Sequence, residues 1–93
     1  MVNFEGIWKN LDGKISIRFI NMPGESDNFK IEFVVGEKIQ DGKIHLSNTD
    51  NIIYHITDFD DLIGNGFLSV VSNKEILINS GKLANLKFFK EKI

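Results

Sequence analysis

Apolar and polar residues alternate along most of this chain with a period of two. The clearest stretch runs over residues 28–35, and its alternate apolar positions are Phe29, Ile31, Phe33 and Val35. Such alternation is typical of a strand with one buried and one exposed face. No apolar period of 3.6 residues persists for three helical turns, so we expect an all-β protein in which any helix is short and lies in a connection.

The same pattern, interrupted by glycine, asparagine and aspartate, predicts eight short strands. They cover residues 5–9, 14–20, 28–35, 43–47, 52–57, 67–72, 75–79 and 83–91. We expect strands 43–47 and 52–57 to form a hairpin. Gly36 and Asp41-Gly42 are expected to frame one turn, and residues 21–27 are expected to form a loop around the single proline.

Gly6-Ile7-Trp8 stands at the head of this series and is typical of the first strand of a small β-barrel. A chain of 93 residues is one domain, spanning 1–93, with room for one core. We therefore predict a small, closed or partly open, eight-stranded β-barrel. Its phenylalanines, its tryptophan and many isoleucines are expected to fill the interior, which leaves no large ligand cavity.

The later strands carry apolar residues on both faces. Phe67 stands beside Leu68, and Phe88 beside Phe89. Since neighbouring residues of a strand point to opposite faces, one of each pair must point out of the barrel. A contiguous exposed apolar patch would indicate a protein partner.

Charge and cysteine content exclude several classes of function. Eleven basic and thirteen acidic residues give a net charge of −2, which does not favour nucleic-acid binding. Without cysteine there is no disulfide, thiol nucleophile or thiolate metal site. The chain has no apolar run of the roughly 20 residues that a membrane helix needs, and Met1–Gly6 does not resemble a signal peptide. We expect a cytoplasmic protein that binds neither nucleic acid nor membrane.

His45 and His55 are the only side chains that titrate near neutrality. The tightest register that keeps Ile44 and Leu46 on the same face as Ile56 places the two imidazoles opposite each other. A metal site would need a third ligand and supporting hydrogen bonds, and the sequence supplies neither. We interpret the histidines as a polar pair facing solvent and expect no bound metal.

Asp58-Phe59-Asp60-Asp61 is an acidic cluster followed by Gly64-Asn65-Gly66. The spacing does not fit a calcium-binding EF-hand loop, and no helix follows the glycines to bind phosphate. We expect Asp60 and Asp61 to be solvated or to cap a turn. The serines have no nucleophile-elbow context and no specified histidine partner, so we expect neither enzymatic activity nor a cofactor.

Four segments in order carry a family resemblance, namely residues 6–10, 15–18, 44–47 and 52–61, with the run Ile52-Ile53-Tyr54 to Asp60-Asp61 as its longest part. In order and spacing they resemble the staphostatins. That family consists of cytoplasmic inhibitors of secreted papain-like cysteine proteases in Gram-positive bacteria. The resemblance covers roughly residues 4–90 and implies a lipocalin-like mixed β-barrel.

The resemblance also implies how the chain acts. Staphostatins lay a loop near the C-terminus through the protease cleft in the substrate direction, with a glycine before the would-be scissile bond. The matching residues here are Ile78, Asn79, Ser80, Gly81, Lys82 and Leu83. Gly81 would precede that bond, Asn79 and Ser80 would fill the non-primed subsites, and Lys82 would lie on the primed side. In a second frame, Leu77 or Ile78 would occupy the apolar second subsite.

Glycine suits this role because it can adopt backbone angles that misplace the carbonyl relative to the nucleophile and the oxyanion hole. The family presents Gly-Thr-Ser, where this chain has Gly81-Lys82-Leu83. Without the resemblance, Ser80-Gly81 is interpreted as an ordinary hairpin turn.

We therefore expect a cytoplasmic inhibitor of a papain-like cysteine protease of the staphopain or streptopain type. The alternative is a barrel that binds an apolar small molecule, with Trp8 closing one end. A third interpretation is a structural or toxin-neutralising interaction protein with an unrelated partner. The sequence leaves the oligomeric state open.

Overall fold

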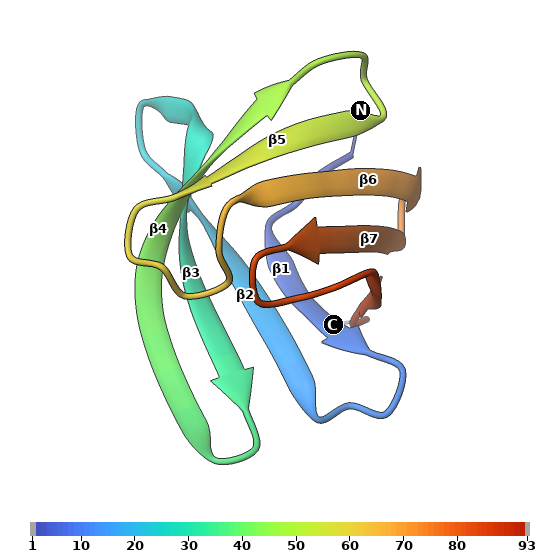
Figure 1. Ribbon diagram of the computed structural model, residues 1–93. Coiled ribbons are helices and arrows are strands. Elements are labelled where there is room, and N and C mark those ends of the chain that lie inside the picture. Colours follow the sequence, from blue (N-terminus) through green and yellow to red (C-terminus); the bar gives the residue numbers. More distant parts are fainter. Residues whose placement is uncertain (1, 93) are drawn as a thin grey trace.

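Eight antiparallel strands close into a barrel in the computed structural model, which describes residues 2–92 (Figure 1). The strands are β1 Gly6–Asn10, β2 Ile15–Met22, β3 Glu25–Val35, β4 Lys38–Asn48, β5 Ile53–Asp58, β6 Gly66–Ser72, β7 Glu75–Ser80 and β8 Leu86–Lys90. Each strand pairs with the next along the chain, and β8 returns to pair with β1. The predicted all-β, eight-stranded barrel is thus confirmed in its closed form. No helix long and apolar enough to cross a membrane occurs in residues 2–92.

The register explains why the alternating pattern folds in this way. Trp8 on β1 stands opposite Ile17 on β2, which stands opposite Phe33 on β3. All three side chains are buried. The neighbouring pair Arg18 and Glu32 lies on the outer face with its ionic groups 3.8 Å apart. Period-two alternation therefore becomes an inside and an outside.

The interior of the barrel is filled by side chains. Its buried members are Phe4, Trp8, Ile17, Phe19, Phe29, Ile31, Phe33, Ile44, Leu46, Ile56, Leu62, Ile63, Leu68, Ile76, Ile78, Leu83 and Phe88. Most come from strands, but four come from connections and from the segment before β1. Phe4 lies at one end of the barrel, and Leu62, Ile63 and Leu83 come from the loops at the other. Both ends are closed by the chain itself.

Phe4 is held by aromatic and polar contacts. Its ring centroid lies 5.1 Å from that of Tyr54 and 6.1 Å from those of Phe19 and Phe29. The indole Nε1 of Trp8 donates to the carbonyl oxygen of Phe4 at 2.9 Å. The only indole nitrogen of the chain is therefore satisfied inside the core.

The expected loop over residues 21–27 is much shorter in the structure. β2 runs to Met22 and β3 starts at Glu25, with only Pro23 and Gly24 between them. Gly24 has φ 77°, and proline followed by such a glycine forms a tight turn. The three residues that follow Glu25 are taken up by an irregularity in the pairing of β2 with β3, so the broader loop prediction was wrong.

Asp41-Gly42 was expected to help frame a turn and instead lies inside β4, opposite Glu32 and Ile31 of β3. A Cβ atom at Gly42 would come within 2.6 Å of Leu62 and within 3.0 Å of Asp60. The glycine therefore makes room for the loop that crosses β4, a tertiary contact with no local signal. The predicted hairpin of residues 43–47 with 52–57 is confirmed as part of β4 and β5.

The apolar residues on both faces of the later strands are arranged as predicted. Leu68 and Phe88 are buried, whereas Phe67 is 50% and Val71 56% exposed. Phe89 is also exposed. Among the last four strands, part of the apolar surface thus faces outwards.

We expect Phe4→Ala to lower the free energy of unfolding by about 3 kcal/mol, because it removes a buried ring from the closed end of the core. Phe59→Ala, which truncates a ring that is 63% exposed, should change it by less than about 0.5 kcal/mol. Urea unfolding followed by Trp8 fluorescence measures both. Equal effects of the two substitutions would contradict the role of Phe4 in closing one end of the barrel.

Candidate functional site

The loop between β7 and β8, residues 81–85, lies against the loop between β5 and β6, residues 59–65 (Figure 1). Backbone and side-chain hydrogen bonds join them. The amide of Gly81 donates to the carbonyl of Asn65 at 3.1 Å, and the amide of Lys82 donates to the carbonyl of Ile63 at 2.9 Å. The Ser80 hydroxyl also donates to the Ile63 carbonyl, at 2.6 Å. We call these two joined loops, together with Ser80, the rim.

Further bonds hold the rim in one conformation. The amide of Ser80 donates to the carbonyl of Leu83 at 2.8 Å, and the amide of Leu83 donates to the Ser80 hydroxyl at 3.3 Å. The Lys82 ammonium group donates to the Asp61 carbonyl at 2.5 Å and lies 3.6 Å from the Asp61 carboxylate. The amides of residues 80–83 thus all bond inwards. Within residues 2–92, the carbonyls of Gly81 and Lys82 accept no backbone hydrogen bond.

The six residues of the predicted protease-binding segment divide into two groups. Ile78 and Leu83 are buried in the core, with 0% and 3% exposure. Asn79, Gly81 and Lys82 are exposed, and Ser80 is half-buried. The segment can therefore present only residues 79–82 to a partner. In the second frame, Ile78 is unavailable for a subsite.

The strained glycine of the rim is Gly64, not Gly81. Gly64 has φ 85°, and a Cβ atom there would lie 2.8 Å from the Cα and the nitrogen of Gly81. Gly81 itself lies outside the left-handed φ region, and a Cβ atom there would meet Gly64 only at an ordinary 3.6 Å. The free rim therefore requires glycine at 64, while position 81 tolerates a side chain.

Asp58 organises the start of the 59–65 loop. Its Oδ2 accepts hydrogen bonds from the amides of Ile63 at 2.7 Å and Gly64 at 2.8 Å, and its Oδ1 accepts one from Asp60 at 3.2 Å. Asp60 in turn accepts from the amide of Lys43 at 2.8 Å. The capping role expected of Asp60 is not seen at its own turn, because its carboxylate bonds to the amide of Lys43 on β4. Asp61 instead pairs with a lysine, and the sequence analysis missed Asp58 as the anchor. Its signal is an aspartate directly before a turn.

The predicted opposition of His45 and His55 was wrong. His45 stands opposite Thr57, and His55 opposite Ser47, because the turn takes up Asp50 to Ile52 and shifts the register by two residues. An even shift preserves the faces, so the buried positions were predicted correctly. The Nδ1 atom of His45 lies 2.7 Å from the Oδ1 atom of Asn28, and the ring of His55 packs edge-on against Phe67.

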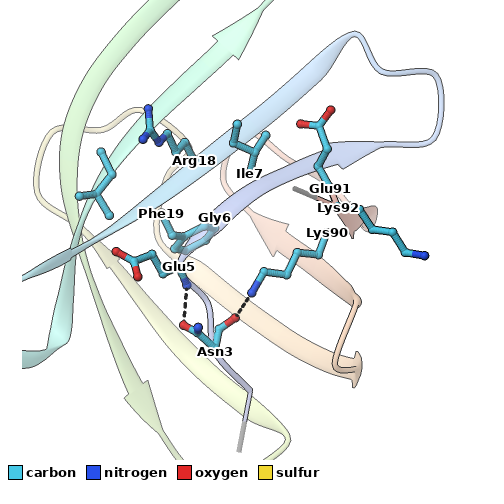
Figure 2. A pocket seen from close by; sticks show the side chains of 10 residues that line it. Asn3, Glu5, Gly6, Ile7, Arg18, Phe19, Lys90, Glu91 and Lys92 are labelled. Atoms are coloured by element: carbon cyan, nitrogen blue, oxygen red, sulfur yellow. Dashed lines mark hydrogen bonds between the residues drawn. The ribbon is translucent and has the colours of Figure 1, made fainter.

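A groove of about 450 Å³ lies on the outside of the barrel, between the start of β1, the middle of β2 and the end of β8 (Figure 2). Two of its charged groups, those of Lys90 and Glu91, are engaged by the chain itself. Lys90 donates to the Asn3 carbonyl at 2.7 Å, and Glu91 pairs with Lys9 at 3.0 Å. Its basic and acidic side chains are mixed, so the groove selects no ligand charge. In residues 2–92, no three histidine, aspartate or glutamate side chains gather to hold a metal ion.

No protein-family model, curated protein or solved structure matches this chain. Its functional interpretation therefore rests on the geometry of the rim and on the resemblance noted in the sequence.

We expect Gly64→Ala to cost at least about 3 kcal/mol of unfolding free energy, since it combines backbone strain with an overlap against Gly81. Gly36→Ala is the matched control, because Gly36 has φ 62° but nothing within 4 Å of an added Cβ. It should cost only about 1 kcal/mol. Gly81→Ala should cost less than about 0.5 kcal/mol. Thermal and urea unfolding measure all three. A Gly64 effect no larger than that of Gly36 would show that the two loops do not interlock.

Proposed function

We propose that this protein is a cytoplasmic inhibitor of a papain-like cysteine protease of the staphopain or streptopain type, and that it enters the cleft with residues 79–82. The observation that carries the proposal is the rim itself. It presents an exposed Gly81 between two residues, Ser80 and Lys82, that are both hydrogen-bonded to the neighbouring loop. A loop that is already ordered loses little conformational entropy when it docks.

The same bonds explain why the segment would inhibit the protease rather than be consumed by it. Ser80 and Lys82 flank Gly81, the residue before the would-be scissile bond, and both donate hydrogen bonds to the Ile63 carbonyl. After cleavage at Gly81, both new ends would stay in place next to each other. The segment that begins at Lys82, which is the leaving group, would then depart slowly. Its proximity to Gly81 would favour re-formation of the peptide bond.

The direction of the backbone groups points the same way. The amides of Ser80 and Gly81 bond inside the rim, so they are not free to pair with a protease as the amides of an extended substrate are. The carbonyl of Gly81 remains free to meet the donors of an oxyanion hole. A loop that makes only some of the contacts of a substrate can bind in the cleft while the protease does not fully stabilise the transition state for its cleavage.

The alternative, an apolar ligand inside the barrel, gains no support from the structure. The space that the ligand would fill is occupied by core side chains, and both ends are closed by Phe4 and by the loop residues Leu62, Ile63 and Leu83. A ligand would first have to displace the side chains that close one of these ends.

We expect the purified protein to inhibit an activated staphopain or streptopain stoichiometrically, and Gly81→Arg to abolish that inhibition, because the arginine side chain obstructs entry into the cleft. Asn73→Arg adds the same side chain to the exposed β6–β7 turn at the other end of the barrel and should inhibit normally. Hydrolysis of a fluorogenic peptide measures the residual activity of the protease.

Mass spectrometry of the mixture distinguishes an inhibitor from a substrate. We expect the wild-type chain to remain intact through many turnovers of the reporter peptide. Rapid cleavage between Gly81 and Lys82 with no loss of protease activity would refute the proposed function. Normal inhibition by Gly81→Arg would refute only the assignment of residues 79–82 as the segment that enters the cleft.

A further inference from the structure

We infer that the outer face of β5, β6 and β7 next to the rim, centred on Phe67, is a second contact surface for the same protease. This inference rests on the proposed function, which it extends from the loop to the body of the barrel.

Register places this surface directly beside the loop. Asn79 stands opposite Phe67, and Phe67 stands opposite His55, so the three side chains form one outward row across β7, β6 and β5. All three are exposed. The row that comes first after the loops contains Gly66, Ser80 and the buried Ile56 and faces inwards, so the Phe67 row is the first outward row across these three strands. A protease that contacts Asn79 in its cleft therefore also faces Phe67.

The next row continues the surface away from the loop. It contains Ile53, Ser69 and Leu77, again on β5, β6 and β7. Neither row carries a lysine, arginine, aspartate or glutamate on these three strands. Elsewhere the outer face is charged, as at Lys30 opposite Lys43. Three of the six side chains in the two rows are apolar and none is that of lysine, aspartate or glutamate, residues that are depleted at the centre of an interface.

A stable interface is larger than the loop alone and needs additional surface beside it. Specific complexes take about 20–30 residues from each partner and bury about 800 Å² on each side. Residues 79–82 are four residues, and one of them has no side chain. The rest of the contact must come from whatever adjoins the loop. On the side of Asn79, that surface is the patch around Phe67.

The arrangement also indicates which part of the protease is involved. Asn79 would lie on the non-primed side of Gly81, and the row leads from Asn79 to Phe67 and His55. The partner surface is therefore the wall beside the non-primed subsites, and its chemistry is apolar and uncharged. The Phe67 ring is already oriented by the His55 ring, whose centroid lies 5.3 Å away, so little side-chain freedom is lost on docking.

The test compares Phe67→Thr with Ile39→Thr. Both replace an exposed apolar residue on the outer face of a strand by a residue that strands accept. Ile39 lies on β4 opposite Val34 of β3, outside the three strands that carry the patch. We expect Phe67→Thr to raise the inhibition constant about tenfold or more, as truncation of a central aromatic contact does. Ile39→Thr should leave it unchanged.

Each result has a separate meaning. If the wild-type protein inhibits and Phe67→Thr inhibits equally well, the second surface does not exist while the proposed function stands. If the wild-type protein does not inhibit at all, the proposed function fails and takes the second surface with it. Size-exclusion chromatography over a range of concentrations completes the test. Self-association that Phe67→Thr abolishes, with no change in inhibition, would assign the patch to a second copy of this chain and overturn the inference. Circular dichroism confirms that both variants fold.

Discussion

The pairing of β8 with β1 is the constraint on which the rest of this structure depends. It removes the free edges of the sheet and encloses an interior that an eight-stranded barrel can fill with side chains. A barrel made of strands alone would still be open at its two ends. Here the chain closes one end with Phe4 and the other with Leu62, Ile63 and Leu83. Closure of the sheet thus forces two loops to become part of the core.

That requirement links the core to the rim. Because Leu62, Ile63 and Leu83 are anchored in the interior, the residues beside them have little freedom at the surface. Gly64 must then pass within van der Waals distance of Gly81, and the Ile63 carbonyl is placed where both Ser80 and Lys82 reach it. The order of the rim is therefore a consequence of packing, and the exposed segment at its tip inherits that order. This is the physical reason why the exposed tip of the rim is held in one conformation.

The fold was predictable where the apolar or polar character of each residue indicates whether it lies on the buried or the exposed face of its strand. Phe29, Ile31 and Phe33 alternate with charged residues, and all three are buried. Prediction failed where the cause lies far away in the sequence. Gly42 has the appearance of a turn residue, but it is a glycine because Leu62 packs on it. The histidine register was predicted wrongly for a local reason. The length of the β4–β5 turn depends on hydrogen bonds from the amide of Asn51 to Asn48 and from the amide of Ile53 to Asp50, which the apolar pattern does not determine.

The same distinction applies to the candidate site. The family resemblance singled out Gly81. The glycine that the backbone requires is Gly64, on the β5–β6 loop, and the sequence did not predict that this loop contacts the β7–β8 loop. This separation matters for the proposed mechanism. Since Gly81 meets only ordinary contacts in the free protein, its lack of a side chain is not needed for folding. A requirement for glycine at position 81 would then arise from the partner, whereas the requirement at position 64 arises from the fold.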